Sequence, residues 1–133
     1  MKKQALYIFI IISLIASCGG TSNKKRSLDS TLFKYASLIR WSDFDNALTF
    51  LKPGIKEIVP SGFELQRLKQ FKVSQYLESP ISPGNNANII LQNVEIQLYN
   101  IHTNKTIVIR DLQAWEYDDE TKRWFNTTGL PKL

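Results

Sequence analysis

The feature that most constrains this chain is an apolar run near its N-terminus that ends at its only cysteine, Cys18. Lys2 and Lys3 precede the run, which extends almost without interruption from Leu6 to Ile15. A transmembrane helix needs roughly 20 apolar residues, so this run is too short to span a bilayer and has the layout of a secretory signal peptide. We therefore expect the folded part of the protein to lie after Cys18.

The end of this run resembles the lipobox of bacterial lipoproteins. Ile15, Ala16 and Ser17 provide an aliphatic and two small residues before Cys18, and two glycines follow it. The resemblance implies that a signal peptidase recognises these three residues and cleaves before Cys18. It also implies that Cys18 carries a diacylglycerol on sulfur and a further acyl chain on the new N-terminus. The alternative is an ordinary signal peptide followed by an incidental cysteine.

The resemblance also predicts a location and a domain layout. Each buried methylene contributes roughly 0.8 kcal/mol, so two or three acyl chains would anchor the protein stably. Gly19 differs from the aspartate that retains lipoproteins of enteric bacteria in the inner membrane, which favours the outer membrane, facing the periplasm. We expect a signal peptide at 1–17, a lipidated cysteine with a flexible polar tether at 18–27, and one domain at 28–133.

Charge and cysteine content exclude several classes of function. The chain has a formal net charge of +5, and loss of Lys2 and Lys3 with the signal peptide lowers it to +3. Three of the remaining cations fall in the predicted tether at 24–26, so the domain is close to neutral and lacks the charge of a nucleic-acid binder. With Cys18 acylated, no thiol remains for a disulfide, a zinc site or a nucleophile.

The first half of the domain has helical patterning. Apolar residues recur at helical spacing from Leu28 to Ile39, with Ser27 as a candidate N-cap. Ser42 is the predicted N-cap of a second helix that ends before Pro53. A third helix is expected from Ser61, three residues before a glutamate in capping-box register.

The second half has strand patterning, with expected strands at 73–77, 88–101, 106–117 and 122–126. Short polar turns at 102–105 and 118–121 favour an antiparallel meander. The apolar parity changes near Gln92, which predicts a bulge or bend there. The predicted fold class is α+β, with N-terminal helices packed on a curved antiparallel sheet of about four strands.

This order of elements resembles the NTF2-like fold, in which helices lie in the concave side of a cone-shaped sheet. Four stretches also resemble an uncharacterised family of small proteobacterial lipoproteins. They are Tyr35–Ala47, Phe71–Tyr76, Val94–Thr103, and Asp111–Pro131 with its Trp115, Tyr117, Arg123, Trp124, Gly129, Leu130 and Pro131. The resemblance implies a fold and a location and brings no catalytic residues with it.

Few residues have patterns typical of catalysis or metal binding. His102 is the only histidine and lies in a predicted turn. The acidic run Asp118–Glu120 lacks the spacing and the glycine of a calcium loop. We therefore predict no metal site, no cofactor apart from the covalent lipid, and no enzymatic activity.

A possible pocket or partner surface is predicted on the last two strands, from Arg110, Asp111, Trp115, Tyr117 and Trp124. Strand parity makes an inward Asp111 conceivable, although pairing of Asp111 with a neighbouring arginine, or capping of a loop by Asp111, is the favoured expectation. Two hypotheses follow. The first is a non-enzymatic envelope lipoprotein that binds a protein or glycan through its sheet face or aromatic hairpin. The alternative is a small-molecule binder or weak enzyme with an NTF2-like pocket around Asp111, Arg110 and Trp115.

Overall fold

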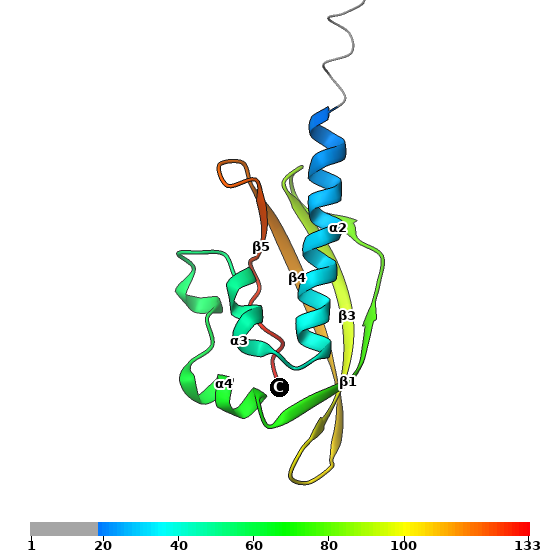
Figure 1. Ribbon diagram of the computed structural model, residues 1–133, viewed down its shortest axis with the longest axis vertical. Helices are drawn as coiled ribbons and strands as arrows, with labels where there is room; N and C mark the ends of the chain where they lie inside the picture. The colour runs from blue at the N-terminus through cyan, green and yellow to red at the C-terminus, as the bar shows by residue number, and fades with distance from the viewer. Residues whose placement is uncertain (1–18) are drawn as a thin grey trace, which may run out of the picture.

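A computed structural model describes residues 19–133 (Figure 1). Helices occupy the first half of this range and strands the second, as the patterning predicts. The helical elements are α2 (Gly19–Arg40), α3 (Phe44–Ala47), η2 (Leu48–Phe50), η3 (Lys56–Ile58) and α4 (Gly62–Leu68), where η marks a 3-10 helix. The strands are β1 (Phe71–Glu78), β2 (Ser82–Pro83), β3 (Ile89–Asn100), β4 (Thr106–Asp118) and β5 (Arg123–Asn126).

The strands form one antiparallel sheet in the order β1-β3-β4-β5, with the short β2 also paired to β3. The sheet is curled, and α2 lies along it in Figure 1, with α3 and α4 to one side. The predicted α+β fold class is therefore confirmed, and the arrangement is compatible with a cone-like NTF2-like fold.

The described residues differ from the prediction of a flexible tether at 18–27, because α2 already begins at Gly19. Lys24 holds this part of the helix against the sheet. Its Nζ donates to Asn88 Oδ1 at 2.5 Å and to Ala87 O at 3.2 Å, and it lies 4.7 Å from the ring centroid of Tyr117. The indole Nε1 of Trp124 donates to the backbone carbonyl of Lys24 at 3.2 Å. These partners are distant in sequence, so composition alone could not predict them.

A tight corner separates α2 from α3. Ser42 has a left-handed φ of +57° and ends α2, so it is not the predicted N-cap of the next helix. Asp43 is that cap, because its side chain accepts a hydrogen bond from Asn46 N. The Ser42 hydroxyl instead accepts a hydrogen bond from Val73 N in β1 at 3.0 Å.

Helix α4 begins as predicted. Ser61 Oγ accepts from Glu64 N at 3.2 Å, and Glu64 Oε2 accepts from Ser61 N at 2.7 Å. The two bonds form a reciprocal capping box, which satisfies two backbone donors at the helix start.

Of the bulge or bend predicted near Gln92, the pairing of β3 with β4 contains no bulge. Strands β3 and β4 pair in continuous register through this region. Gln92 itself faces inward and donates to Ser79 O, whereas Leu91 is exposed. The register shift lies in β1, between Val73 and Gln75.

The core lies between α2 and the concave face of the sheet. Tyr35 packs edge-on against Trp115, with ring centroids 5.0 Å apart. Beyond β5, the chain segment at Leu51 pairs with Asn126, and Lys52 N donates to Asn126 O. Other fully buried side chains that fill this space are Ile39, Phe44, Ile96 and Leu98.

Candidate functional site

The concave face holds a buried polar cluster centred on Gln113. Strand alternation turns Asp111, Gln113 and Trp115 of β4 toward the helices. Gln113 Nε2 donates to Asp111 Oδ2 at 2.7 Å and to the Tyr76 hydroxyl at 3.1 Å. Gln113 Oε1 accepts from Trp115 Nε1 at 3.1 Å. Gln113 thus fixes the position of the only carboxylate in the cluster.

Two further polar groups border the cluster. The Tyr35 hydroxyl on α2 and Asn126 Nδ2 on β5 are both buried, and neither has a hydrogen-bond partner among the described residues. Asn126 Oδ1, in contrast, accepts from the backbone N–H groups of Thr128 and Gly129. The Asn126 side chain is near enough to Tyr35 to lower the pKa of its hydroxyl, so the two groups face each other, and one water or a small polar group between them would satisfy both.

Burial dominates the electrostatics of the cluster. It raises the pKa of Asp111, while the hydrogen bond from Gln113 and the positive charge of Lys132 act in the opposite direction. Burial, together with the Asp111 charge, also raises the pKa of Tyr35. Burial likewise raises the pKa of Tyr76, so both tyrosines stay protonated at neutral pH, and Asp111 acts as the acceptor of the hydrogen bond from Gln113.

The predicted site residues do not form one site. Arg110 is exposed and faces away from Asp111, because neighbouring residues of a strand point to opposite faces. Trp115 is fully buried and is linked to Asp111 through Gln113, which lies between them on β4. Tyr117 and Trp124 lie together under Lys24, at the sheet end that faces the start of α2. Ile15, Ala16, Ser17 and Cys18 lie outside the described residues.

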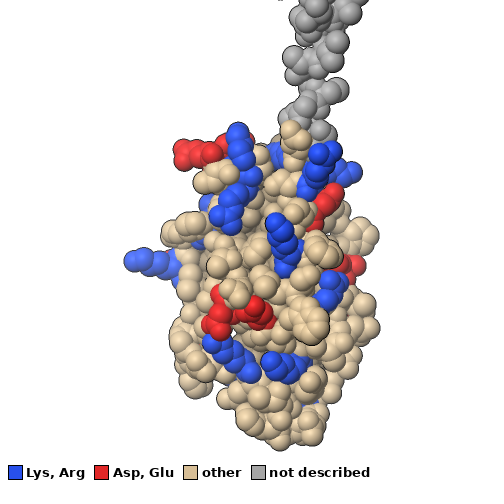
Figure 2. All heavy atoms as spheres, in the orientation of Figure 1, with Lys and Arg blue, Asp and Glu red and all other residues tan. Residues whose placement is uncertain are grey.

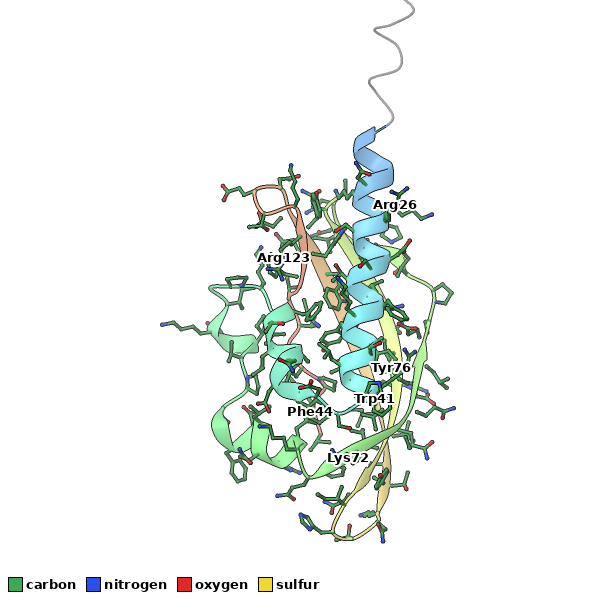
Figure 3. All side chains as sticks on the ribbon, in the orientation of Figure 1. Arg26, Trp41, Phe44, Lys72, Tyr76 and Arg123 are labelled. Atoms are coloured by element: carbon green, nitrogen blue, oxygen red, sulfur yellow. The ribbon has the colours of Figure 1, made fainter. Side chains whose placement is uncertain are left out.

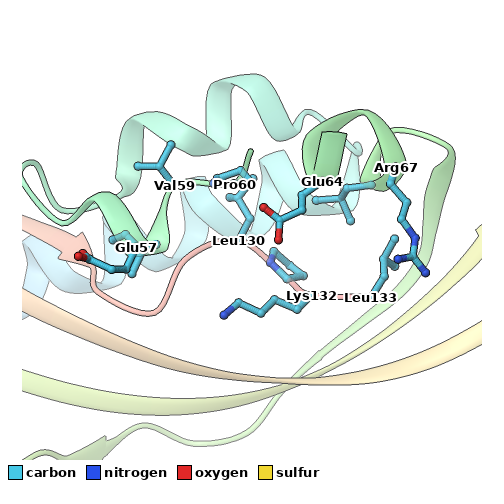
Figure 4. A pocket seen from close by; sticks show the side chains of 11 residues that line it. Glu57, Val59, Pro60, Glu64, Arg67, Leu130, Lys132 and Leu133 are labelled. Atoms are coloured by element: carbon cyan, nitrogen blue, oxygen red, sulfur yellow. The ribbon is translucent and has the colours of Figure 1, made fainter. Parts of the chain in front are cut away.

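A groove that sequence reasoning missed lies between α4 and the C-terminal residues (Figure 4). Its volume is about 250 Å³. Glu64 lies on the α4 side and Lys132 on the side of the C-terminal segment. The Glu64 carboxylate accepts the capping-box hydrogen bond from Ser61 N, and the hydrogen bonds with Ser61 lower the pKa of Glu64. The groove has an apolar floor and a rim of both charges; its lining includes Glu57, Ile58, Arg67, Leu68, Leu130 and Pro131.

The convex face of the sheet carries exposed aliphatic side chains. On β4, Val108 and Leu112 flank Arg110, with 57% and 67% of their surfaces exposed. Arg110 is paired in register with Glu95 of β3, and Glu95 with Leu77 of β1. The result is an apolar patch around a pair of opposite charges. We call it the convex patch: Leu77, Glu95, Val108, Arg110 and Leu112.

Within residues 19–133, no helix is long and apolar enough to cross a membrane, and no three His, Cys, Asp or Glu side chains are grouped so as to hold a metal ion. Comparisons of the chain with protein-family models, curated proteins and solved structures give no match.

Proposed function

We propose that this chain is a lipid-anchored envelope lipoprotein, held in the outer membrane and facing the periplasm, whose domain is a non-enzymatic binding module. The lipobox-like Ile15–Cys18 segment supports the anchor. The position of α2 fits it as well, because the folded domain begins at Gly19, directly after the expected lipid attachment site.

The convex patch is the observation on which the binding role rests. Leu112 and Val108 are the most exposed aliphatic side chains of β4. Their apolar surface would leave water if a partner covered the sheet, at about 25 cal/mol per Å². The convex patch combines aliphatic side chains with Arg110 and Glu95 and contains no aromatic ring on which a sugar could stack, so it favours a protein partner over a glycan. Soluble proteins seldom leave a large apolar patch uncovered without a role for it.

Site-specific photo-cross-linking in living cells tests this role. A photoreactive side chain at Leu112 should give a discrete cross-linked product, whereas one at Lys56 on η3 should give none. The charge variant Val108→Lys should abolish the product from position 112 while the domain stays folded, because Val108 is exposed. Equal products from both positions, or none from Leu112, would contradict the proposed partner surface.

The anchor has its own test. Mass spectrometry of the protein purified from membranes should find an N-terminal Cys18 carrying acyl chains. Cys18→Ser should leave the precursor uncleaved and unlipidated. An unmodified Cys18 in the membrane form would contradict the proposal.

The alternative, a small-molecule binder around Asp111, has one favourable observation: the unpartnered Tyr35 hydroxyl and Asn126 Nδ2 beside the Asp111 cluster. Two observations weigh against it. The Trp115 ring occupies the interior that a ligand would need, and Arg110 lies on the other face. A high-resolution crystal structure separates the two cases. Density for one water between Tyr35 and Asn126 favours a structural role, and density for a larger molecule favours ligand binding.

A further inference from the structure

Two large aromatic side chains lie on the outer side of α2 and do not pack in the core. Leu28, Tyr35 and Ile39 face the sheet and are buried. On the opposite side, Phe33 has 69% and Trp41 83% of its surface exposed. Trp41 N donates to Ser37 O at 3.0 Å, so the helical bonding continues through Trp41.

Basic side chains lie on the same side of α2 as these aromatic rings. Arg26 lies seven residues before Phe33, two turns along the helix, and Lys34 directly follows Phe33. Among residues 23–133 neither Arg26 nor Lys34 takes part in an ion pair. Figure 3 shows Arg26 toward the N-terminal end of α2 and Trp41 at its C-terminal end. We call Arg26, Phe33, Lys34 and Trp41 the α2 stripe.

The chemistry of the α2 stripe fits a bilayer surface. Tryptophan and phenylalanine are stabilised at the headgroup level, and lysine and arginine are attracted by anionic lipid headgroups. Figure 2 shows basic side chains spread over the face that α2 occupies, with acidic ones between them. Asp29 is the acidic residue of α2, and it lies about 60° around the helix from Arg26, next to the basic and aromatic side chains of the stripe.

From this arrangement we infer that the α2 stripe is a membrane-docking surface, so that the domain lies along an anionic bilayer with α2 parallel to it. The inference rests on the proposed lipid anchor, which would hold the N-terminal end of α2 at the same surface. A helix of 22 residues is about 33 Å long. A domain that stood upright on its anchor would therefore keep Trp41 roughly 30 Å from the lipid.

Tryptophan fluorescence distinguishes the two orientations. Trp41 is exposed, whereas Trp115 and Trp124 have 0% and 3% of their surfaces exposed. The full-length protein, purified from membranes, is reconstituted into vesicles of phosphatidylethanolamine and phosphatidylglycerol with or without brominated acyl chains. Bromine quenches an indole only at close range. We expect brominated vesicles to remove the Trp41 emission, and Trp41→Phe to lose this quenching while remaining folded.

Charge variants test the electrostatic part. Arg26→Gln with Lys34→Gln should weaken the quenching, whereas Lys105→Gln, at the exposed turn between β3 and β4, should not. Replacing phosphatidylglycerol by phosphatidylcholine should have the same effect as the double variant.

The outcomes separate this inference from the proposed anchor. Protein that floats with the vesicles but shows no Trp41 quenching overturns the docking surface and leaves the anchor standing. Protein that does not float with the vesicles contradicts both. Quenching that disappears when purified envelope proteins are added assigns the α2 stripe to a protein partner and also overturns the inference.

Discussion

Replacing Lys24 by methionine removes the charge that holds the first turns of α2 to the sheet and keeps an apolar stem of similar length. The lost contacts are the hydrogen bonds from Nζ to Asn88 and Ala87 and the position of Nζ over the Tyr117 ring. A hydrogen bond of a charged group contributes about 1.5–3 kcal/mol when buried, and a cation–π contact about 0.5–1 kcal/mol at an exposed site. Because Lys24 is only half-buried, we expect a loss of about 1–2 kcal/mol.

Thermal and urea unfolding measure this loss directly. For a domain of this size, 1 kcal/mol lowers Tm by about 4–8 °C. Lys25→Met is the matched control, because it removes the same charge from an exposed neighbour and should change stability by less than about 0.5 kcal/mol. Hydrogen exchange should also accelerate at residues 19–27 in Lys24→Met alone. If the two variants are equally stable and hydrogen exchange at residues 19–27 is unchanged, Lys24 does not hold this end of α2 to the sheet. The prediction of a flexible tether would then stand.

Two other predictions concern the cluster and the C-terminal segment. Burial raises the pKa of Asp111, so stability falls as pH rises from the ordinary carboxyl range through the raised value. Asp111→Asn should therefore be more stable than the natural protein at pH 7, by about 1.4 kcal/mol per unit of pKa shift, and should lose this advantage near pH 4 in urea unfolding. An equal difference at both pH values would contradict the burial argument. Gly129→Ala should cost about 2 kcal/mol, since φ is +96° and the new Cβ would lie 2.9 Å from Ile58 O. Gly54→Ala is the control, because φ is +87° there and the new Cβ would meet no atom, so only the backbone cost of about 1 kcal/mol should remain. Equal losses of stability in the two variants would show that the contact with Ile58 has no effect.

Local signals in the sequence predicted local structure well. The capping box at Ser61 depends on residues three positions apart, and the structure contains it. Strand parity allows the inward orientation of Asp111 that is observed, but the favoured expectation, pairing with an arginine or capping of a loop, is wrong, because Asp111 accepts a hydrogen bond from Gln113. Both features are decided within a few residues, which is the range over which patterning carries information.

The features that the sequence did not predict depend on distant partners. A basic segment at 24–26 is typical of a solvated tether, and only the sheet end around Asn88 and Trp124 keeps it helical. The change of apolar parity near Gln92 predicted a bulge or bend, yet Gln92 is tolerated inside the sheet because Ser79 O accepts its hydrogen bond. The grouping of Arg110 with Asp111 was wrong for a local reason, because neighbouring residues of a strand point to opposite faces of the sheet.

The helical half of the chain also forms a hydrogen bond with each of the two edge strands of the sheet, β1 and β5. On β1, the Ser42 hydroxyl accepts a hydrogen bond from Val73 N. On β5, Lys52 N donates a hydrogen bond to Asn126 O. Unpaired edge strands recruit strands from other molecules and seed fibril growth. These two bonds make edge-to-edge pairing of neighbouring copies less favourable, and they leave the convex face of the sheet and the outer side of α2 as the surfaces for association.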